Sequence, residues 1–240
     1  ETFYPTDVME TAGEIIFFWV ARMIMLGLYT AKKIPFKNVY LHGLVLDAKG
    51  QKMSKSRGNV INPLDLTDKY GTDALRIGLV VGNTPGTSLA LDENRIRGYR
   101  NFSNKIWNAG RFVIMNTGGT DIKKKPRLSA KDAKFLSEFN KLIAGTTQDM
   151  DNFKFYYAAE KLYHYFWHTF ADKIIEEKKK DLEGDDPVKK SSGKWLLLEI
   201  YATCLQLLHP FMPFITEEIY TNLIPSWSGK KMLIIENWPK

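Results

Sequence analysis

The pattern of apolar and polar positions in the first third of the chain is that of an α/β unit. Residues 11–31 form an apolar segment that is too long for a strand and ends at the polar pair Lys32-Lys33, which predicts a helix packed between other elements. Residues 39–46 form a short, mostly apolar and β-branched run, typical of a strand buried in a parallel sheet. A loop bounded by glycines, residues 50–58, follows this strand. Helix, strand and loop in this order predict the closing part of an α/β domain.

The next segment predicts a helical connection to a second part of the chain. Residues 63–70 and 73–81 have the pattern of two short helices, and Pro63 suits a first helical turn. No further strand of the buried type is expected between Pro63 and the C-terminal region. A turn signal at residues 83–86 marks a hinge, so we expect one domain at residues 1–85 and another at residues 86–240.

The second part of the chain has long helical patterns joined by polar linkers. Helices are predicted at residues 92–115, at residues 130–180 with a break near 151–152, and at residues 194–223. The linkers at residues 118–126 and 181–193 are polar, charged spacers. Long helices joined in this way predict an antiparallel bundle and a mainly α fold, and residues 232–235 are expected to form a small strand or a docked tail.

Composition points to a class of partner and excludes others. Of the 240 residues, 44% are hydrophobic and 25% charged, which excludes a wholly disordered or fibrous chain. There are 34 Lys and Arg against 27 Asp and Glu, and the net charge of +7 favours a polyanionic partner such as nucleic acid. Cys204 is the only cysteine, which excludes an intramolecular disulfide and favours the reducing cytoplasm. Residues 15–29 are too short to span a bilayer and carry Arg22, which costs about 2.5–3.5 kcal/mol there, so no membrane is expected.

The loop at residues 50–58 carries the main chemical signal. Lys52, Lys55 and Arg57 place three cations within six residues, separated by serines and flanked by glycines. Such a loop can close over a triphosphate, because its ammonium groups neutralise charge and its hydroxyl and N–H groups donate hydrogen bonds. The GxxxxGK[ST] spacing of a P-loop is absent. A solvated basic surface loop is the alternative that composition leaves open.

Residues 52–56 read KMSKS, the signature of class I aminoacyl-tRNA synthetases, and their place between residues 42–45 and 58–60 is that of the family. Residues 18–23 and 100–108 resemble the valyl branch, and residues 208–218 resemble the closing bundle helix of the valyl, isoleucyl and leucyl enzymes. The resemblance implies the C-terminal end of a Rossmann-type α/β catalytic domain followed by a helical anticodon-binding domain. The isoleucyl branch, a non-catalytic tRNA-binding module and a helical scaffold are the alternatives.

The resemblance also implies a reaction and its substrates. Valine would be activated with ATP, which enters with Mg²⁺, and then passed to its isoacceptor tRNA; no protein-bound metal and no obligate protein partner are expected. The HIGH signature of the family is missing, since no HxGH occurs in the sequence. The chain also opens on Glu1 rather than Met. We therefore expect a piece of a longer protein that is inactive by itself.

Residue roles follow from the same resemblance. It assigns Lys55 to the phosphates of ATP, with Lys52 as its support, and extends the ATP site to Val45, Met53, Ser54 and Ser56. Met53 as plain core packing is the alternative for that residue.

The resemblance places the amino-acid pocket at the start of the long apolar segment. Ile15 and Trp19 would line it, four residues apart and so on one helical face, and Glu14 would meet the substrate ammonium where the family commonly has Asp. Without the resemblance, Ile15 and Trp19 would be interpreted as core residues.

A basic helical face predicts the tRNA contact. Residues 95–111 contain five Lys and Arg and no acidic residue. Arg100, Asn104, Asn108 and Arg111 share one helical face, whereas Phe102, Ile106, Ala109 and Val113 share another that suits the core. Amide and guanidinium groups beside an aromatic ring suit unpaired bases, and the resemblance assigns Asn104, Lys105, Arg111 and Phe112 to the anticodon. A solvated basic face is the alternative.

Two other features are expected to be structural. His164 and His168 have a spacing that can hold zinc, but they lie among aromatic residues and suggest no third ligand, so a packed aromatic helix is favoured. The lysine runs at residues 123–125 and 178–180 are typical of solvated helix ends.

Overall fold

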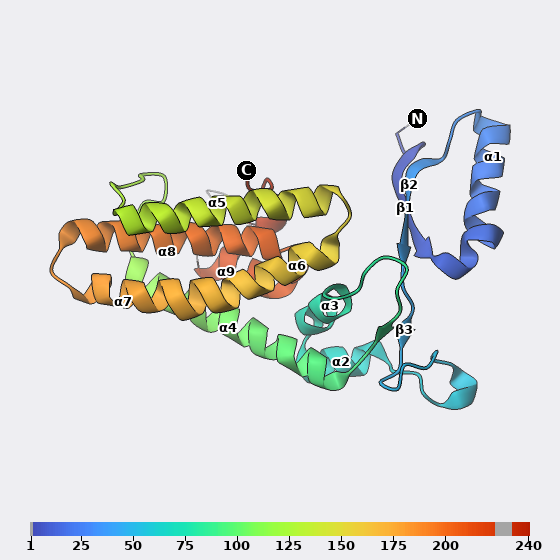
Figure 1. Ribbon diagram of the computed structural model, residues 1–240, viewed down its shortest axis with the longest axis horizontal. Coiled ribbons are helices and arrows are strands. Elements are labelled where there is room, and N and C mark those ends of the chain that lie inside the picture. The colour runs from blue at the N-terminus through green and yellow to red at the C-terminus, as the bar shows by residue number, and fades with distance from the viewer. Residues whose placement is uncertain (1, 224–231) are drawn as a thin grey trace. The chain divides into compact units, whose positions relative to one another are not determined.

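The computed structural model describes residues 2–223 and 232–240 (Figure 1). Contacts between residues divide the chain into two compact units. The first comprises Glu1–Ile61 and Gly82–Asp92, and the second comprises Asn62–Val81 and Glu93–Lys240. The expected boundary between residues 85 and 86 stays a prediction.

The first unit is built on a pair of parallel strands joined by a helical crossover. Strand β1 (Thr6–Ala12) pairs with β2 (Phe36–His42). Between them the chain forms a 3-10 turn, η1 (Gly13–Ile15), a π-helical turn, η2 (Ile16–Val20), and helix α1 (Ala21–Ala31). Strand, helix and parallel strand in this order are the βαβ arrangement that the apolar pattern predicted in part.

The strands differ from the prediction at three places. Thr11 and Ala12 belong to β1, so the helical segment begins at Gly13. The predicted strand at residues 39–46 is broken at Gly43, which passes so close to Thr87 that a Cβ would lie 1.4 Å from the Thr87 carbonyl oxygen. Beyond the break, β3 (Val45–Leu46) pairs in parallel with β4 (Leu89–Ala90). The expectation of no further strand of the buried type between Pro63 and the C-terminal region did not foresee β4, because two residues are too few to leave a periodic signal.

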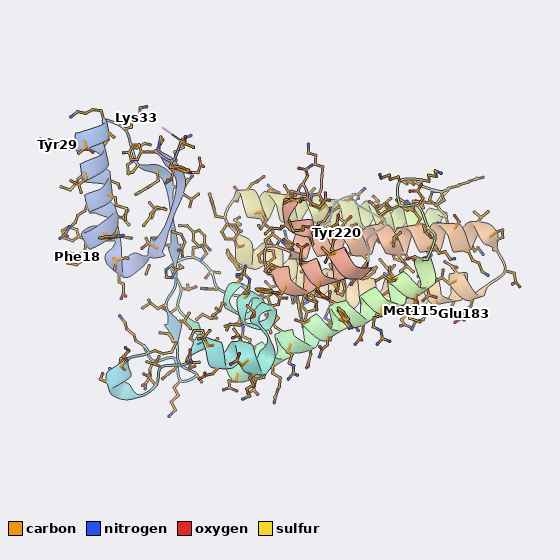
Figure 2. The ribbon with its side chains drawn as sticks, turned by 180° about the vertical axis from the view of Figure 1, so that it is seen from behind. Phe18, Tyr29, Lys33, Met115, Glu183 and Tyr220 are labelled. Carbon is orange, nitrogen blue, oxygen red and sulfur yellow. The ribbon has the colours of Figure 1, made fainter. Side chains whose placement is uncertain are left out.

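The helical segment between β1 and β2 is more exposed than expected. The described residues cover α1 at Gly27, which lies against Tyr4 and Pro35, but they leave most of its apolar side chains exposed. Phe18 and Tyr29, which are 61% and 76% exposed, project from this segment (Figure 2). Among the described residues the helix is therefore not packed between other elements. Gly13–Ala31 is long and apolar enough to cross a membrane by those two criteria alone.

The second unit is a helical bundle, and the prediction of one helix at residues 194–223 is wrong, because this segment is divided into two helices between Leu208 and Pro213. Two short helices come first, α2 (Pro63–Tyr70), capped by the Asn62 side chain, and α3 (Thr72–Val80). The longer elements are α4 (Glu93–Thr117), α5 (Ala130–Asp151), α6 (Phe155–His164), the π-helical η4 (Tyr165–Ile175), α7 (Glu176–Glu183), α8 (Pro187–Leu208) and α9 (Pro213–Leu223). The mainly α fold, with an α/β part and a helical bundle, is confirmed.

The ends of the helices explain the remaining differences. The predicted break near residues 151–152 is confirmed, since α5 ends at Asp151 and Phe153 has a positive φ of 58°. Helix α8 begins inside the predicted linker, because Asp186 accepts the N–H groups of Val188 and Lys189 and Pro187 fits the first turn. The C-terminal segment is docked, through η5 (Leu233–Ile235) and a hydrogen bond from Trp238 to Thr147 of 2.8 Å.

Helix α8 is the centre of the bundle. It contacts α4, α5, α6, α7 and α9, and its residues from Trp195 to Leu208 are buried except for Glu199 and Gln206, which are partly exposed. Its Tyr201 is fully buried and donates a hydrogen bond of 3.0 Å to the Ile106 carbonyl oxygen of α4. A Cβ at Gly110 would lie 2.2 Å from the Tyr201 hydroxyl oxygen, so Gly110 makes room for this side chain.

Candidate functional site

The KMSKS loop, residues 50–58, leaves β3 through a tight turn. The Asp47 carboxylate accepts the N–H groups of Lys49 and Gln51 at 2.9 and 2.8 Å, and Gly50 has a φ of 74°. The returning chain then forms an antiparallel bridge between Leu46 and Lys52. This turn brings the start of the KMSKS loop back beside β3.

The tip of the loop presents two cations whose side chains have no partner among the described residues. Lys55, Ser56 and Arg57 form a single 3-10 turn, η3 (Lys55–Arg57), which ends at Gly58 with a φ of 67°. The side chains of Lys55 and Arg57 are exposed and make no hydrogen bond or ion pair with the residues that the structure describes. The hydroxyl oxygens of Ser54 and Ser56 lie 3.2 Å apart. Two unpaired cations beside two hydroxyl groups are suited to a phosphate group.

Lys52 and Glu14, both predicted as site residues, are brought together. Lys52 Nζ lies 3.0 Å from Glu14 Oε2, although the two residues are far apart in the sequence. Their side chains are 63% and 51% exposed, so this ion pair contributes about 0–1 kcal/mol and is easily displaced.

Ile15 and Trp19 have a different local geometry from the predicted one. Ile15 ends a 3-10 turn and Trp19 lies in a π-helical turn, so their four-residue spacing is not that of one α-helical face. Their side chains are 40% and 56% exposed, so neither is a core residue among those described. Their contact with an amino acid stays a prediction.

Val45 and Met53 lie at the inner end of the loop. Both side chains are half-buried, and Val45 pairs with Leu89 through β3 and β4. Met53 Sδ accepts the N–H of Ile61 at 3.4 Å, so Met53 has a packing role in this structure. Its role toward ATP stays a prediction.

Two residues that the sequence analysis did not single out support this loop. The Asn59 side chain bonds to Asp47 on one side and to the backbone of Ser54 on the other. In the sequence, the signal for this supporting role is the position of Asn59, an amide residue directly after Gly58, the glycine that ends the loop.

The basic face of α4 divides as predicted. Phe102, Ile106, Ala109 and Val113 are buried in the bundle. Arg100, Asn104, Asn108 and Arg111 are exposed, and their side chains make no hydrogen bond or ion pair with any part of the chain that the structure describes. The exposed stripe, as we call these four residues, is thus available to a partner.

Lys105 and Phe112 lie outside the exposed stripe. Lys105 Nζ is 2.7 Å from Asp172 Oδ1 of η4 and 5.2 Å from the centre of the Trp167 ring. The hydrogen bond from Lys105 holds the pKa of the Asp172 carboxyl below its usual range. Phe112 is half-buried, with Lys179 Nζ 5.6 Å from its ring centre. The run at residues 95–111, which contains no acidic residue, therefore has a carboxylate beside it in space.

The structure gives different environments to the second lysine run, residues 178–180, and to the histidine pair, His164 and His168. Lys178 is 1% exposed, so the prediction of a solvated lysine run is wrong at this residue. His164 and His168 are exposed and their rings stack at 5.8 Å, whereas Phe166 between them is buried. No cluster of three or more His, Cys, Asp or Glu that could hold a metal occurs within residues 2–223 and 232–240.

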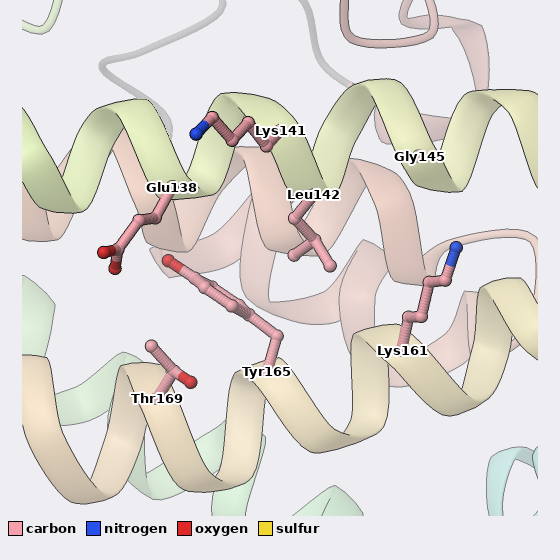
Figure 3. A pocket seen from close by; sticks show the side chains of 7 residues that line it. All are labelled: Glu138, Lys141, Leu142, Gly145, Lys161, Tyr165 and Thr169. Atoms are coloured by element: carbon pink, nitrogen blue, oxygen red, sulfur yellow. The ribbon is translucent and has the colours of Figure 1, made fainter.

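A cavity of about 370 Å³ lies between α5 and η4, away from every predicted site residue (Figure 3). Tyr165 reaches across it from η4, and its buried hydroxyl has no hydrogen-bond partner among the described residues. Burial raises the pKa of this hydroxyl well above its usual range. The lining residues are Glu138, Lys141, Leu142, Gly145, Lys161, Tyr165 and Thr169.

Comparison with known families matches the part of the chain that carries the KMSKS loop and the helical bundle to two family models. Residues 1–92 match the model of the class I tRNA synthetases (I, L, M and V), and residues 132–240 match the anticodon-binding domain of tRNA ligase. The chain belongs to the class I tRNA synthetases. Most of α4 lies between the two matched ranges.

Two individual relatives belong to the valyl branch of this family. The chain is 44% identical to the valine--tRNA ligase of Clostridium tetani and 45% identical to that of Pelagibacter ubique, in both cases over its whole length. It spans 27% and 28% of the length of these two proteins.

Solved structures share the fold. A ternary complex of Agrobacterium radiobacter K84 agnB2 LeuRS, tRNA and LeuAMS gives a TM-score of 0.75 at 20% identity, with 98% of this chain and 28% of that chain covered. Mycobacterium tuberculosis methionyl-tRNA synthetase with methionyl-adenylate gives 0.77 at 18% identity, with 97% and 47% covered.

Proposed function

We propose that this chain is part of an enzyme that attaches valine to its tRNA. The observation that carries the proposal is the 44–45% identity, over 99–100% of the chain, to valine--tRNA ligases from Clostridium, Pelagibacter and Geobacter. The same similarity argues against an isoleucine enzyme and against a scaffold without a ligand. The chain contributes the KMSKS loop, part of the valine pocket and the surface that contacts tRNA.

The chemistry has two steps. A carboxylate oxygen of valine bonds to the α-phosphorus of ATP, the bond from that phosphorus to the bridging oxygen breaks, and pyrophosphate leaves. The oxygen of a terminal hydroxyl of the tRNA then bonds to the valine carbonyl carbon, and the hydroxyl proton is released. The bond from that carbon to the phosphate oxygen breaks, and AMP leaves. ATP enters this reaction with Mg²⁺ as part of the substrate.

Lys55 stabilises the charge that develops on the leaving pyrophosphate. Its ammonium group is exposed and unpaired within the described chain, so it loses no protein partner when it binds phosphate. A fixed cation that interacts more strongly with the transition state than with bound ATP lowers the barrier. Ser54 and Ser56 donate hydrogen bonds to the same phosphates, and Val45 and Met53 border the adenine.

Glu14, Ile15 and Trp19 contribute to the valine pocket. The Glu14 carboxylate binds the substrate ammonium, in competition with Lys52, which lies 3.0 Å away in this structure. Because the ion pair is exposed, a substrate ammonium displaces Lys52 at little cost. Lys52 is then free to support Lys55 at the phosphates.

The exposed stripe of α4 reads the anticodon. Its two amides and two guanidiniums offer hydrogen bonds to base edges, and Phe112 offers a ring for stacking. Lys105 joins the contact when a phosphate competes with Asp172 for its ammonium. The net charge of +7 supports association with a polyanion.

The cytoplasm is the compartment that fits this function. The apolar segment Gly13–Ala31 is long enough to cross a membrane, but Arg22 lies near its middle and the segment falls inside the synthetase match. A charged residue at that depth costs about 2.5–3.5 kcal/mol. We therefore interpret the segment as part of the catalytic domain.

The 240-residue chain alone is expected not to activate valine, because it contains no HxGH sequence and spans 27% of its relatives. The measurement is valine-dependent ATP–pyrophosphate exchange by the purified chain. Exchange above that of a Lys55→Ala variant of the same chain would contradict this prediction.

If the exposed stripe reads the anticodon, substitutions in it should weaken binding by an amount that depends on the tRNA. Arg111→Ala or Asn104→Ala should weaken binding of valine tRNA by about 1–3 kcal/mol, the scale of one lost base contact, and should change binding of an anticodon-exchanged tRNA little. The measurement is filter binding of wild-type and Arg111→Ala protein to both tRNAs. Arg97, which bonds to Asn94 at 2.9 Å on the same helix, is the matched control. Arg97→Ala should weaken the binding of both tRNAs to the same extent, because it removes at most a contact with phosphate. Equal losses on both tRNAs in Arg111→Ala would reduce the stripe to a non-specific basic face.

A further inference from the structure

The base of the KMSKS loop is held by one side chain that bonds in three directions. Asn59 Oδ1 accepts the N–H of Ser54 at 2.9 Å. Asn59 Nδ2 donates to Asp47 Oδ2 at 2.8 Å and to the Lys52 carbonyl oxygen at 3.3 Å. The segments before, within and after the loop are thus joined at a single amide group.

Asp47 extends this connection into the preceding turn. Its other carboxylate oxygen accepts the N–H groups of Lys49 and Gln51, and its backbone N–H donates to the Gln51 carbonyl oxygen at 2.9 Å. The hydrogen bond from Asn59, together with that from Gln51, holds the pKa of the Asp47 carboxyl below its usual range. The carboxylate is therefore charged at neutral pH, when it is needed as an acceptor.

The base and the tip of the loop differ in the exposure and the hydrogen bonding of their side chains. The side chains of Asp47, Asn59 and Met53 are half-buried and hydrogen-bonded, whereas those of Lys55 and Arg57 are exposed and unpaired within the described chain. A phosphate-binding loop needs a fixed base and a free tip. The base holds the cation in position, and a cation without an ion-pair partner keeps its charge available for the phosphate.

We propose that Asp47 and Asn59 form a loop clamp, a pair of positioning residues that holds Lys55 in the geometry required for phosphate binding. The catalytic consequence rests on the proposed function of the loop. The clamp acts through Lys55 and does not touch the substrate.

An asparagine is required at position 59 because the site needs a donor and an acceptor on one short side chain. Aspartate has nearly the same shape and can still accept the N–H of Ser54. It cannot donate to Asp47 or to the Lys52 carbonyl, and it brings a second negative charge against Asp47. Asn59→Asp therefore opens the clamp with little change in volume.

Limited trypsin digestion of the 240-residue chain tests the clamp independently of any ligand, because Lys52, Lys55 and Arg57 are cleavage sites within the loop. Asn59→Asp should raise the rate of cleavage in the loop by about tenfold, since a hydrogen bond to a charged group is lost and the segment opens more often. The matched control is Asn62→Asp, three residues further on. Asn62 accepts the N–H of Leu64 at 3.1 Å to cap α2, which aspartate does equally well, and it donates to Asp65 Oδ1 at 2.9 Å. The control thus also replaces an amide by a carboxylate beside an aspartate, but outside the loop. This control should cleave at the wild-type rate.

Exchanging the two residues tests the pairing itself. The double variant Asp47→Asn with Asn59→Asp restores a donor opposite an acceptor, so its cleavage rate should return to within about threefold of wild type. Faster cleavage in Asn59→Asp that the exchange does not reverse would overturn the direct pairing. A wild-type rate in Asn59→Asp would overturn the clamp altogether.

Activity of the complete enzyme separates the clamp from the proposed function. Asn59→Asp should lower kcat of valine-dependent ATP–pyrophosphate exchange by about tenfold and leave KM for valine within about twofold, because Lys55 is misplaced while the valine pocket is intact. If Lys55→Ala impairs exchange and Asn59→Asp does not, positioning by the clamp is wrong and the proposed function stands. If trypsin supports the clamp but Lys55→Ala leaves exchange unchanged, the clamp stands and the role of the loop in ATP chemistry is wrong.

Discussion

Lys55→Ala in the complete enzyme is expected to lower the rate of valine activation by about 10²–10³, the scale for loss of one transition-state charge stabiliser. The ammonium lies on an exposed 3-10 turn with no partner in the described chain, so its removal leaves the local fold intact. The loss should appear in kcat, because the pyrophosphate charge that Lys55 meets develops during the reaction. Lys52→Ala should cost less, since Lys52 supports Lys55 and is not the principal cation at the phosphates. The measurement is ATP–pyrophosphate exchange.

Two comparisons make this result specific. Lys49→Ala removes an exposed lysine from the turn before the KMSKS loop and keeps the backbone N–H that Asp47 accepts, so it should exchange at the wild-type rate. The affinity for tRNA should be nearly unchanged in Lys55→Ala. If Lys55→Ala instead mainly raised the Kd for tRNA, the loop would bind RNA phosphate rather than ATP.

Lys178→Met is expected to destabilise the bundle by about 3–5 kcal/mol, the cost of leaving a buried charge without its partner. Lys178 and Asp132 are each 1% exposed, and Lys178 Nζ contacts Asp132 as well as Asp181, the latter at 2.6 Å. Ser192 of α8 donates a hydrogen bond to Asp132, so α5, α7 and α8 meet at this cluster. Without the ammonium group, the Asp132 carboxylate stays buried with no counter-charge. The measurement is urea unfolding followed by circular dichroism.

Variants of neighbouring residues test whether the loss comes from the buried charge. Lys180→Met removes an exposed lysine two residues further along the same helix and should change the free energy of unfolding by less than about 0.5 kcal/mol. Adding Asp132→Asn to Lys178→Met should recover part of the loss, because neither buried charge then remains. Equal unfolding midpoints for Lys178→Met and Lys180→Met would show that the ion cluster does not stabilise the bundle.

The same cluster sets a pH dependence. Burial by itself lowers the pKa of Lys178, but hydrogen bonds to Asp132 and Asp181 outweigh it, and the net direction is upward from the usual 10.5. A lysine whose pKa is higher in the folded than in the unfolded chain stabilises the fold fully below 10.5. Its contribution is lost as the pH rises through the folded value. Wild-type protein should therefore lose stability above pH 10.5 to a greater extent than Lys178→Met does.

The long helices and the KMSKS loop could be predicted because their signals are local. Helix α4 was predicted within two residues at its C-terminal end, and the burial of Phe102 and Val113 followed from helical periodicity. The loop was recognised from five consecutive residues and its glycines. These features depend on neighbours along the chain, which the sequence displays directly.

The pairings across the chain were decided by the tertiary structure. Strand β4 is two residues long, and it forms because the Leu89 N–H donates a hydrogen bond of 2.8 Å to the carbonyl oxygen of Leu44, which lies in a segment remote along the chain. The run at residues 95–111 contains no acidic residue, yet Asp172 approaches Lys105 from η4. Glu14 and Lys52 likewise meet across a separation of 38 residues.

Lys178 shows the physical reason most clearly. In sequence it belongs to a run of three lysines on a charged helix, which is typical of a solvated helix end. Only the packing of α5 and α8 against α7 removes it from water, and burial is tolerated because Asp132 and Asp181 lie within reach of its ammonium group. The sequence by itself predicted which segments are helical, and it displayed the KMSKS signature on which the proposed phosphate contact rests. Which charges are paired depends on distances between segments that are remote along the chain, and these exist only after the helices have packed.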